Sequence, residues 1–462
     1  MTAPPGATAP LVYKFGGTSV GDAARIARVA ELVAAAGEPV VVVVSAVAGT
    51  TDALSAVARE RGAGQPVSEA IDSIGADHRA IAGDLFAEAP ERLHGVAASL
   101  DRVIAQLHEG ATATPGSAED GDRIRAAGED LSSRLLAGAL EARGHPTQRI
   151  DARDLVLTDA RFGGADPDEE GIAAAADALL RPALAAGRTV VVQGFVGRAP
   201  DGRTTTLGRG GSDLTASLLG AALGAREVHI WTDVDGILSG DPRAVDHPRR
   251  IDRIGFEEAV ELATFGAKVL HPGAAKYAVS RALTVRIRST FEPERPGTLI
   301  VRDRWDPAGV AAIAFKPGVG LVQVRSHPSA IPYGFLARVF DVLTRHKLPV
   351  DLVATSHTST AFTLDAGAEV ARATAELRLF AEVAVRTRLA TVTVVGHGLL
   401  QTPGVVARVF AEVGDTPVHL VSQASDVSLS LVVDEADARP LMRRLHAVLV
   451  EGADPSNDEE TP

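Results

Sequence analysis

The stretch from residue 11 to residue 44, LVYKFGGTSVGDAARIARVAELVAAAGEPVVVVV, carries the strongest signal for the fold class of this chain. It begins with a short apolar segment, Leu11–Phe15, that we expect to form a strand, and Asp22–Ala36 repeats apolar residues at helical spacing. Val40–Val44 is an unbroken run of valines, which is typical of a strand covered on both faces. The order strand, helix, strand therefore predicts a βαβ unit in a parallel sheet.

Further along the chain the same pattern continues. Thr189–Gln193 and Val228–Thr232 are two more apolar segments that we expect to be strands, and Ala70–His108 is alanine-rich and predicted to be helical. Residues 11–300 are therefore expected to form one α/β domain. The preceding residues 1–10 are expected to be a disordered leader.

The C-terminal third of the chain contains an internal repeat. Gly334–Phe340, GFLARVF, is echoed by Gly404–Phe410, GVVARVF, and a similar series of strands and helices follows each copy. We expect two ferredoxin-like modules of βαββαβ order, over residues 311–388 and 389–452. A linker rich in charge and proline lies around residues 292–306, and the acidic residues 453–462 are predicted to be disordered.

Composition excludes several classes of protein. A length of 462 residues indicates roughly two to four domains. The formal net charge of −13 disfavours binding to nucleic acid, and no apolar stretch approaches the ~20 residues of a membrane span. The chain has no cysteine and its first residues lack the charge and hydrophobicity of a signal peptide, so we expect a cytoplasmic protein without thiol chemistry.

The turn after the first strand admits more than one interpretation. Residues 17–21, GTSVG, match the G-x-S-x-G motif of α/β-hydrolases, but a hydrolase would have several strands before this motif, and no oxyanion segment of the HGGG type is present. The longer segment KFGGTS, residues 14–19, favours a phosphate site, because its glycines let a ligand approach the backbone and Lys14 adds a positive charge. Only five of the 46 basic residues are lysines, which makes a lysine here notable. A plain turn with a solvated lysine is the alternative.

A second glycine-rich segment, GRTTTLGRGGSD, occupies residues 202–213 and leads into a predicted helix. Ser212 or Asp213 could simply cap that helix. Capping does not account for Arg209, which lies between glycines and is suited to bind a carboxylate with two hydrogen bonds. Together Arg209 and Asp213 could bind the carboxylate and the ammonium of an α-amino acid.

A third segment, WTDVDGILSGDPR, covers residues 231–243 at the end of a predicted strand, where open α/β sheets bind ligands. Asp233 and Asp235 could be metal ligands, but Asp-Gly and Asp-Pro pairs are also common in turns, and we favour a turn at Asp235. Lys268 lies beside another glycine, and with Lys14 and Arg243 it could neutralise a triphosphate. The 13 histidines lack metal-site spacing, so His271 is interpreted as structural.

Taken together, these motifs resemble the signatures of the aspartate kinase family within the amino-acid-kinase superfamily. The resemblance also includes GEDLSS around Glu129, QGFVGR at residues 193–198 and ELATFGAKVLHP at residues 261–272. The C-terminal repeat resembles the tandem ACT domains that this family carries. The resemblance implies a three-layer, parallel-sheet kinase domain and ATP-dependent phosphorylation of the side-chain carboxylate of L-aspartate, the first step of lysine, threonine and methionine biosynthesis.

The resemblance also implies roles for individual residues. Lys14 and Asp213 would be the catalytic residues. The aspartate pocket would contain Ser45, Thr51, Glu129, Phe195, Arg209, Gly210, Gly211 and Ser212. The residues facing ATP would be Lys14, Phe15, Gly16, Gly17, Thr232, Asp233, Leu238, Arg243, Lys268 and Val269. The family often has an aromatic residue at the position of Leu238. No metal-binding side chains are assigned, because Mg²⁺ would be held mainly by phosphate oxygens and water.

For the ACT pair, the resemblance implies feedback inhibition, by L-lysine or alternatively by threonine. The effector site would contain Phe335, Leu336, Asp351, Thr355 and Ser356. The same modules would join chains into a homodimer or larger oligomer. Two alternatives stay open: a non-catalytic amino-acid sensor, and an amino-acid kinase with another acidic substrate.

Overall fold

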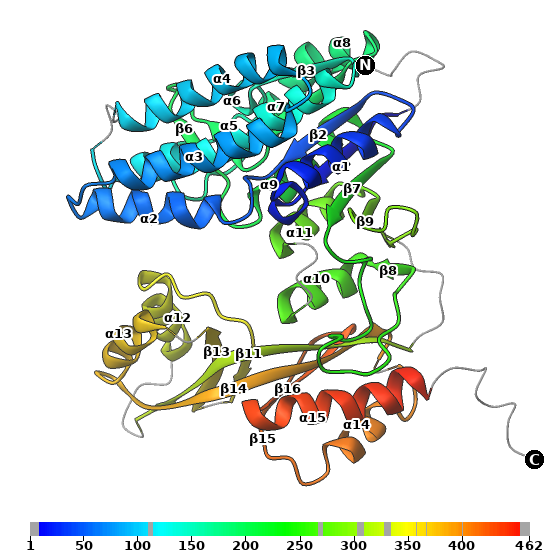
Figure 1. The fold of residues 1–462 in the computed structure, drawn as a ribbon. Coiled ribbons are helices and arrows are strands. Elements are labelled where there is room, and N and C mark those ends of the chain that lie inside the picture. The colour runs from blue at the N-terminus through cyan, green and yellow to red at the C-terminus, as the bar shows by residue number, and fades with distance from the viewer. Residues whose placement is uncertain are drawn as a thin grey trace, which may run out of the picture. The chain divides into compact units, whose positions relative to one another are not determined.

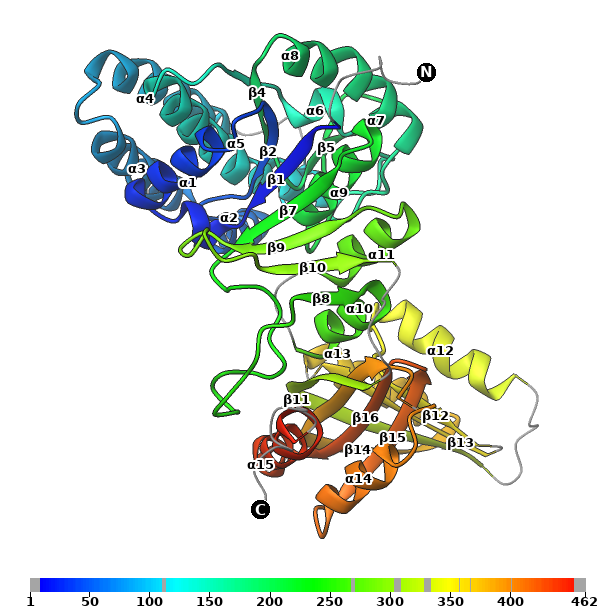
Figure 2. The same ribbon diagram turned by 90° about the vertical axis from the view of Figure 1, so that its right-hand side faces the viewer.

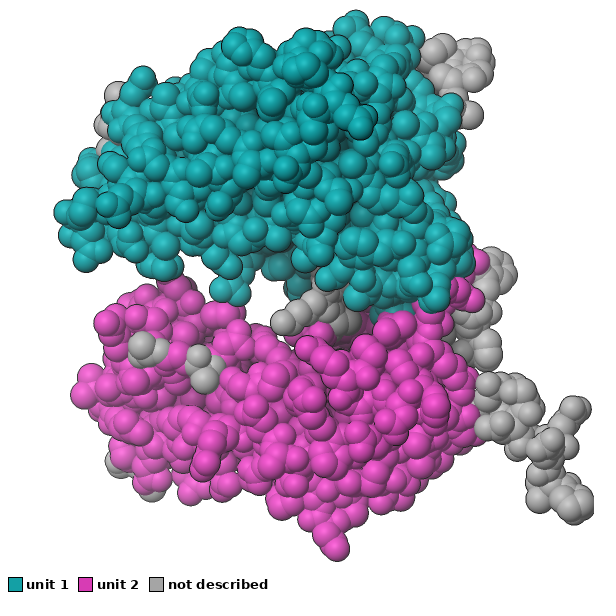
Figure 3. All heavy atoms as spheres, viewed as in Figure 1, with its two compact units in different colours: residues 1–237, 269–302 teal, residues 238–268, 303–462 magenta. Residues whose placement is uncertain are grey.

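A computed structural model of the protein describes residues 9–109, 114–266, 271–302, 309–327, 334–356, 358–365, 367–399 and 401–452. The chain divides into two compact units, which Figure 3 colours separately. Unit 1 comprises Met1–Ile237 and Val269–Arg302, and unit 2 comprises Leu238–Lys268 and Asp303–Pro462. Residues 238–268 therefore group with unit 2, although they fall within the range 11–300 assigned above from the sequence.

In unit 1 the strands follow the order β3-β4-β2-β1-β7-β9-β10. Neighbours from β3 to β9 are parallel, and β10 is antiparallel to β9. The bounds are β1 Leu11–Phe15, β2 Val40–Val44, β3 Thr147–Arg149, β4 Thr189–Gln193, β7 Glu227–Thr232, β9 Val285–Ser289 and β10 Thr298–Val301. The parallel sheet predicted from the sequence is thus confirmed.

Helices cover both faces of this sheet (Figures 1 and 2). α1 and α5 lie on one face, with α2, α3 and α4 packed around them, and α9 lies on the other face with α7 and α11. The bounds are α1 Ala23–Ala34, α2 Thr50–Gly62, α3 Ser68–Leu85, α4 Pro90–His108, α5 Ala118–Ala142, α6 Ala152–Leu155, α7 Glu169–Ala175, α8 Arg181–Ala185, α9 Gly211–Leu223 and α11 Pro272–Ser280. This three-layer arrangement explains why every valine of β2 is fully buried.

Local sequence signals set several of these helix ends. Asp22 caps α1, because its carboxylate accepts a hydrogen bond of 2.8 Å from the backbone N–H of Arg25. The helical region expected over Ala70–His108 consists of two helices, α3 and α4. Pro90 begins α4, and since proline has no backbone N–H it fits the first turn of a new helix better than the interior of a longer one.

Unit 2 contains an antiparallel sheet of order β12-β13-β11-β14-β16-β15. The strand bounds are β11 Gly309–Ser326, β12 Val353–Thr355, β13 Ser359–Asp365, β14 Ala381–His397, β15 Val418–Ser425 and β16 Ser428–Asp434. The helices are α10 Phe256–Phe265, α12 Phe335–Arg345, α13 Ala368–Leu377, α14 Val405–Val413 and α15 Glu435–His446, and the short strand β8 covers Arg253–Gly255.

The two halves of this sheet are ferredoxin-like modules that share β11 and β14. The second half of β11, from Val319, pairs with β13 and with the first half of β14, whereas Gly309–Lys316 pair with the second half of β14. The first module therefore runs β11, α12, β12, β13, α13, β14. The second module runs β14, α14, β15, β16, α15 and takes its fourth strand from the start of β11. The fold prediction is confirmed, but the modules are intertwined, because in the described chain the second copy ends in helical structure with no fourth strand of its own.

Residues 238–268 contribute to the core of the second module. Ala244 and Val245 are buried in the same apolar cluster as Val392 and Met442. His446, fully buried at the end of α15, is hydrogen-bonded through Nε2 to the hydroxyl of Ser239 at 2.8 Å and through Nδ1 to Glu451 at 2.9 Å. Packing and buried hydrogen bonds thus hold this segment against α15.

Replacing His446 by alanine is expected to lower the free energy of unfolding by about 2–4 kcal/mol. The substitution leaves a cavity and removes the buried partner of Ser239. Urea denaturation of the full chain, followed by circular dichroism, measures the effect. His397→Ala is the matched control, because His397 is exposed and its loss should cost less than about 0.5 kcal/mol. Equal stability of both variants and the parent would show that the contact does not stabilise unit 2.

Candidate active site

A cavity of about 590 Å³ in unit 1 gathers the residues predicted above for catalysis and aspartate binding. It opens where β1, β2 and β4 end, the usual position of a ligand site in a parallel sheet. All ten residues of those two groups line it: Lys14, Ser45, Thr51, Glu129, Phe195, Arg209, Gly210, Gly211, Ser212 and Asp213. The structure therefore brings together segments that lie up to about 200 residues apart in the sequence.

Six further lining residues were missed from the sequence: Asp52, Ser55, Arg125, Gly163, Thr206 and Gly208. Thr206 and Gly208 lie within the glycine-rich segment quoted above and could have been included. Ser55 follows Thr51, and Arg125 precedes Glu129, by one turn of α2 and α5, so helical spacing from a suspected site residue would have found both. Gly163 carries no local signal.

Lys14 lies on β1, and its Nζ atom is 2.7 Å from Oδ1 of Asp213, at the start of α9. Both side chains are only 12% exposed. The other oxygen of Asp213 accepts a hydrogen bond of 3.3 Å from the backbone N–H of His271. The ammonium that Asp213 holds in this structure is thus that of Lys14, which fixes the position of the lysine charge in the cavity.

The turn after β1 depends on glycine. A Cβ atom on Gly17 would lie 2.8 Å from the carbonyl oxygen of Ala46, closer than real contacts allow. The absence of a side chain lets this turn lie against the segment that follows β2. That close approach brings Lys14 to the same cavity as Ser45 and Thr51.

Glu129 is almost completely buried on α5, with 4% of its surface exposed. Its Oε1 atom accepts a hydrogen bond of 3.1 Å from the backbone N–H of Ala46, and Oε2 has no hydrogen-bond partner among the described residues. Burial raises the pKa of Glu129 to about 8, and the neighbouring charge of Asp130 adds to this, against the effect of the backbone hydrogen bonds and Lys14. A buried carboxyl oxygen without a partner is suited to receive a ligand cation.

The segment before α9 presents a helix N-terminus to the cavity. Gly210 has a φ of 71°, a left-handed conformation that favours glycine, and α9 begins at Gly211. The first backbone N–H groups of a helix attract anions. Arg209 is exposed in this loop, and Phe195, with an unusual φ of 68°, packs against Gly211. Left-handed backbone at a bulky residue is typical of a functional site.

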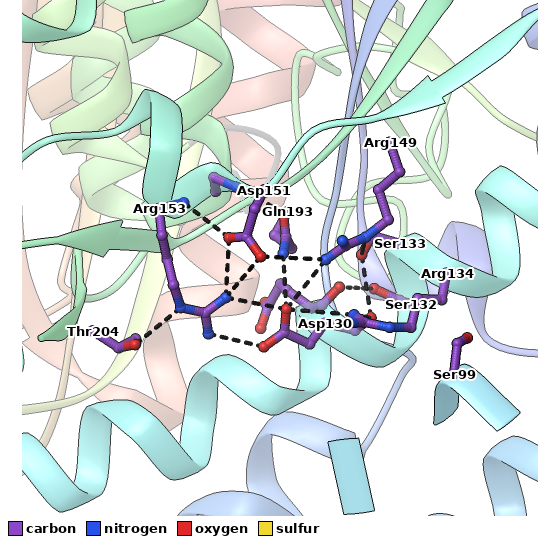
Figure 4. A network of polar contacts seen from close by, with 12 residues as sticks. Ser99, Asp130, Ser132, Ser133, Arg134, Arg149, Asp151, Arg153, Gln193 and Thr204 are labelled. Atoms are coloured by element: carbon purple, nitrogen blue, oxygen red, sulfur yellow. Dashed lines mark hydrogen bonds and ion pairs between the residues drawn. The ribbon is translucent and has the colours of Figure 1, made fainter. Parts of the chain in front are cut away.

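Behind Glu129, a polar network centres on Asp130 (Figure 4). The Asp130 carboxylate accepts hydrogen bonds of 2.8 Å from both Arg153 and Gln193, and one of 3.3 Å from Arg149. Although burial alone would raise it, Arg153, Gln193 and the charge of Arg134 hold the pKa of Asp130 below its usual value. Gln193 also accepts a hydrogen bond of 2.9 Å from the N–H of Ala152. The network therefore ties α5 to the end of β4 and to α6, and so fixes the helix that carries Glu129.

The residues predicted to face the nucleotide are distributed over both units. Lys14, Gly16 and Gly17 belong to β1 and its turn; Thr232 and Asp233 lie at the end of β7, with a hydrogen bond of 3.1 Å from the Thr232 hydroxyl to Asp233. The ring of Phe15 is fully buried and stacks on Trp231, so only its backbone can face a ligand.

In unit 2, Leu238 is half-buried, and Arg243 is exposed and paired with Asp241 at 2.9 Å. Lys268 and Val269 lie outside the described residues. In unit 1, Asp235, for which a turn was favoured over a metal site, is paired with Arg295 at 3.1 Å. The described residues contain no cluster of three or more potential metal-ligating side chains.

A separate cavity of about 560 Å³ lies in the first ferredoxin-like module. Of the five predicted effector residues it is lined by Thr355 and Ser356, together with residues such as Arg325 and Glu382. Asp351 is paired instead with Lys316, at 2.6 Å. Phe335 and Leu336 begin α12 and, like Asp351, are not among the residues that line this cavity.

Comparison with known proteins finds similarity over nearly the whole chain. The model of the amino acid kinase family matches residues 9–289, and that of an ACT domain matches residues 392–449. The chain is 37% identical to lysine-sensitive aspartokinase 3 of Escherichia coli, over 96% of this chain and 99% of that protein. It is 34% identical to the chloroplastic aspartokinase 3 of Arabidopsis thaliana, over 95% of this chain and 81% of that protein.

Comparison with solved structures finds similarity to the same family. Escherichia coli aspartokinase III in complex with aspartate and ADP, in the R-state, gives a TM-score of 0.79 at 36% identity and covers 95% of this chain and 99% of its own. The same enzyme in complex with lysine and aspartate, in the T-state, gives a TM-score of 0.81 at 36% identity, with coverages of 96% and 100%.

Proposed function

The chain belongs to the amino acid kinase family, in its aspartokinase branch, and from this premise we propose how its own residues transfer a phosphoryl group from ATP to L-aspartate. The observation that carries the assignment of residues is that a single cavity combines the Lys14–Asp213 pair with the buried, unpartnered oxygen of Glu129.

The reaction needs alignment and charge neutralisation more than proton transfer. The side-chain carboxylate of aspartate is already ionised at neutral pH, so it attacks the γ-phosphorus without a general base. A bond forms between a carboxylate oxygen and phosphorus, and the bond from phosphorus to the β,γ-bridging oxygen breaks. The products are 4-phospho-L-aspartate and ADP. Lys14, held by Asp213, stabilises the negative charge of the transferring group.

The cavity offers a partner for each charged end of aspartate. Glu129 receives the α-ammonium on its free oxygen, a role that residue types alone suggested for Asp213. Arg209 binds the α-carboxylate with its planar guanidinium. Ser45, Thr51 and Ser212 supply hydrogen-bond donors, Phe195 lines the same pocket, and the glycines at residues 210 and 211 admit the substrate backbone.

For the nucleotide, we propose Lys14, Gly16, Gly17, Thr232 and Asp233 of unit 1 as contacts, together with the backbone of Phe15. Leu238, Arg243, Lys268 and Val269 stay predictions from the resemblance. Because Asp213 already holds Lys14 and the described residues contain no cluster of three or more potential metal ligands, a Mg²⁺ ion would be held mainly by phosphate oxygens and water. When bound, such an ion would neutralise phosphate charge.

The ACT modules supply regulation in this proposal. The relative from Escherichia coli is named lysine-sensitive, and one of its structures contains lysine. We propose L-lysine as the effector here, with threonine as the second candidate. β12 and β15 carry the exposed apolar side chains Val353 and Val421, which suits assembly into a homodimer or larger oligomer. No helix in the described part of the chain is long and apolar enough to cross a membrane. We propose a cytoplasmic enzyme that acts early in the biosynthesis of lysine, threonine and methionine.

A substrate panel tests the proposed function. ADP release would be measured with L-aspartate, L-glutamate, N-acetylglutamate, carbamate and UMP, and trapping with hydroxylamine would identify an acyl phosphate. Aspartate should be the preferred acceptor. Preference for another acceptor would assign a different kinase, and no turnover with any of them would favour the amino-acid sensor.

Replacing Arg209 by alanine is expected to raise KM for aspartate roughly 10- to 150-fold while KM for ATP changes less than about threefold. A hydrogen-bonded pair of charges contributes about 1.5–3 kcal/mol, and this pair involves the amino acid only. Steady-state kinetics with each substrate varied in turn would measure the effect. A larger change in KM for ATP would reverse the assignment of the two glycine-rich segments.

The pH dependence of aspartate binding should report on Glu129. As the pH rises through its pKa of about 8, kcat/KM for aspartate should increase, because the carboxylate attracts the substrate ammonium and the carboxylic acid does not. Glu129→Gln should lower kcat/KM and remove this pH dependence. An identical pH profile in the variant would assign the ammonium to another residue.

Stability should change in the opposite direction. Between the ordinary pKa of 4.5 and about 8, Glu129 is ionised in the unfolded chain but protonated in the folded protein. The folded state then holds the extra proton, so this carboxyl lowers the free energy of unfolding as the pH rises across that interval. Glu129→Gln should reduce this slope in urea denaturation experiments.

A further inference from the structure

Arg125 lies on α5, one helical turn before Glu129, on the same face of the helix. It lines the same cavity as Glu129, and its side chain is 26% exposed. One turn of helix rises about 5.4 Å, so the two side chains lie within the span of a small amino acid. Arg125 is therefore positioned at the aspartate pocket, although none of the motifs quoted above includes it.

Asp122 fixes the position of Arg125. Its carboxylate is fully buried and accepts a hydrogen bond of 2.8 Å from Nη2 of Arg125. It also accepts hydrogen bonds of 2.9 Å and 2.8 Å from the backbone N–H and the hydroxyl of Thr206, and one of 2.8 Å from the N–H of Gly163. Arg125, Thr206 and Gly163 all line the cavity, so a single buried carboxylate organises one wall of it.

The guanidinium of Arg125 retains unused donors. Within the described part of the chain, its hydrogen bond to Asp122 involves Nη2 only, and neither Nη1 nor Nε has a protein acceptor. Arginine presents five N–H donors in a planar fork that matches a carboxylate. A fork held from one side by Asp122 is preorganised to bind a second carboxylate from the cavity.

The charges in the cavity indicate which carboxylate this is. Lys14 is paired with Asp213 and assigned to the phosphoryl group, and the side-chain carboxylate of aspartate must stay free to attack. The α-carboxylate is bonded to the same carbon as the α-ammonium that Glu129 receives, so it lies beside Glu129, where Arg125 is. We propose that Arg125 binds the α-carboxylate of aspartate together with Arg209 and that Asp122 is its positioning residue, an inference that rests on the proposed function.

The chain offers a matched control. Arg123 lies two residues earlier on α5 and pairs with Asp120 at 3.1 Å, as Arg125 pairs with Asp122 at 2.8 Å, each with a partner three residues before it. The side chains of the two arginines are similarly exposed, at 24% and 26%. Arg123 does not line the aspartate cavity. The variants Arg125→Ala and Arg123→Ala thus remove the same group from the same helix, one inside the site and one outside it.

The experiment compares aspartate with its α-carboxamide, L-aspartic acid α-amide, which keeps the reacting carboxylate and the ammonium. With aspartate, Arg125→Ala should raise KM about tenfold with kcat and KM for ATP nearly unchanged, Arg125→Lys should give an intermediate value, and Arg123→Ala should match the parent. With the α-amide the parent should bind less well, and Arg125→Ala should add less than a twofold loss. A structural role for Arg125 would weaken both substrates equally.

Three results would overturn the inference. Arg125→Ala could leave KM for aspartate unchanged, or it could raise KM equally for aspartate and for the α-amide. Arg123→Ala could also raise KM for aspartate as much as Arg125→Ala does. Calorimetric titration of the full chain with aspartate gives a readout independent of turnover. If the parent binds aspartate but releases no ADP, the proposed function fails and the binding comparison still judges Arg125. If the parent does not bind aspartate at all, both fail.

Discussion

Turnover should fall about 10²- to 10³-fold when Lys14 is replaced by alanine, more than the accompanying loss of stability can explain. Loss of one preorganised charge from a transition state commonly costs this much. Lys14 is 12% exposed and its ammonium is held 2.7 Å from Asp213, so its charge is fixed before the substrates arrive. Since the substitution leaves the largely buried carboxylate of Asp213 without its ion-pair partner, the free energy of unfolding should also fall, by up to about 3–5 kcal/mol. Single-turnover phosphoryl transfer and urea denaturation measure the two effects.

Arginine should not replace this lysine. A guanidinium is broader than an ammonium, and Nζ of Lys14 is held 2.7 Å from a single oxygen of Asp213, a position suited to a compact charge. Lys14→Arg is therefore expected to lose most of the activity. Lys276→Ala is the control, because Lys276 is an exposed lysine on α11 of the same unit and its removal changes the net charge equally. Turnover of Lys14→Arg close to that of the parent would contradict the role of a compact charge.

Much of unit 1 could be predicted from sequence because its signals are local. β2 could be predicted from its valine run alone, because a strand buried on both faces does not alternate apolar with polar residues. The pocket residues were found because glycine-rich turns and the residues beside them occur in short consecutive segments, such as residues 14–19 and 208–213. Each of these segments follows a strand or precedes a helix, which is where parallel sheets bind ligands.

What the sequence did not reveal depends on contacts between distant segments. Asp122 is linked to Thr206 and Gly163 through folding alone, and no motif includes it. The assignment of Asp213 to a substrate ammonium relied on residue type, whereas the structure places the ammonium of Lys14 beside it. Likewise, the two modules share β11, and this shows only in the pairing of strands across the sheet. The sequence pattern of one strand does not tell which partner each half of it pairs with.

At the feedback site, the protein's own Lys316 and a lysine effector would compete for the same carboxylate. Asp351 was placed in the effector site from the resemblance, yet its carboxylate holds Nζ of Lys316 at 2.6 Å, and Asp365 holds the same atom at 2.8 Å. Glu382 lines the cavity that Thr355 and Ser356 line. A lysine effector could therefore place its ammonium on Asp351, by displacing Lys316, or on Glu382.

L-Lysine is expected to inhibit the enzyme by weakening aspartate binding about 5- to 150-fold, a coupling free energy of about 1–3 kcal/mol. Titration of ADP release with lysine, and separately with threonine, at several aspartate concentrations measures this coupling. Reciprocity requires that saturating aspartate weaken lysine binding by the same factor. If neither amino acid alters the kinetics of the full chain, the ACT modules do not sense lysine or threonine.

Three variants then distinguish the two carboxylates. If Asp351 binds the effector, Lys316→Gln should lower the lysine concentration for half-inhibition, because it removes the competing ammonium, and Asp351→Asn should raise it. If Glu382 binds it, only Glu382→Gln should raise that concentration. Lys347→Gln, which removes an exposed lysine of the same module, controls for the change in net charge. A stronger inhibition in Lys316→Gln alone would mean that the protein's own lysine sets the effector concentration at which the enzyme responds, since every effector molecule must first displace an ammonium already held by two carboxylates.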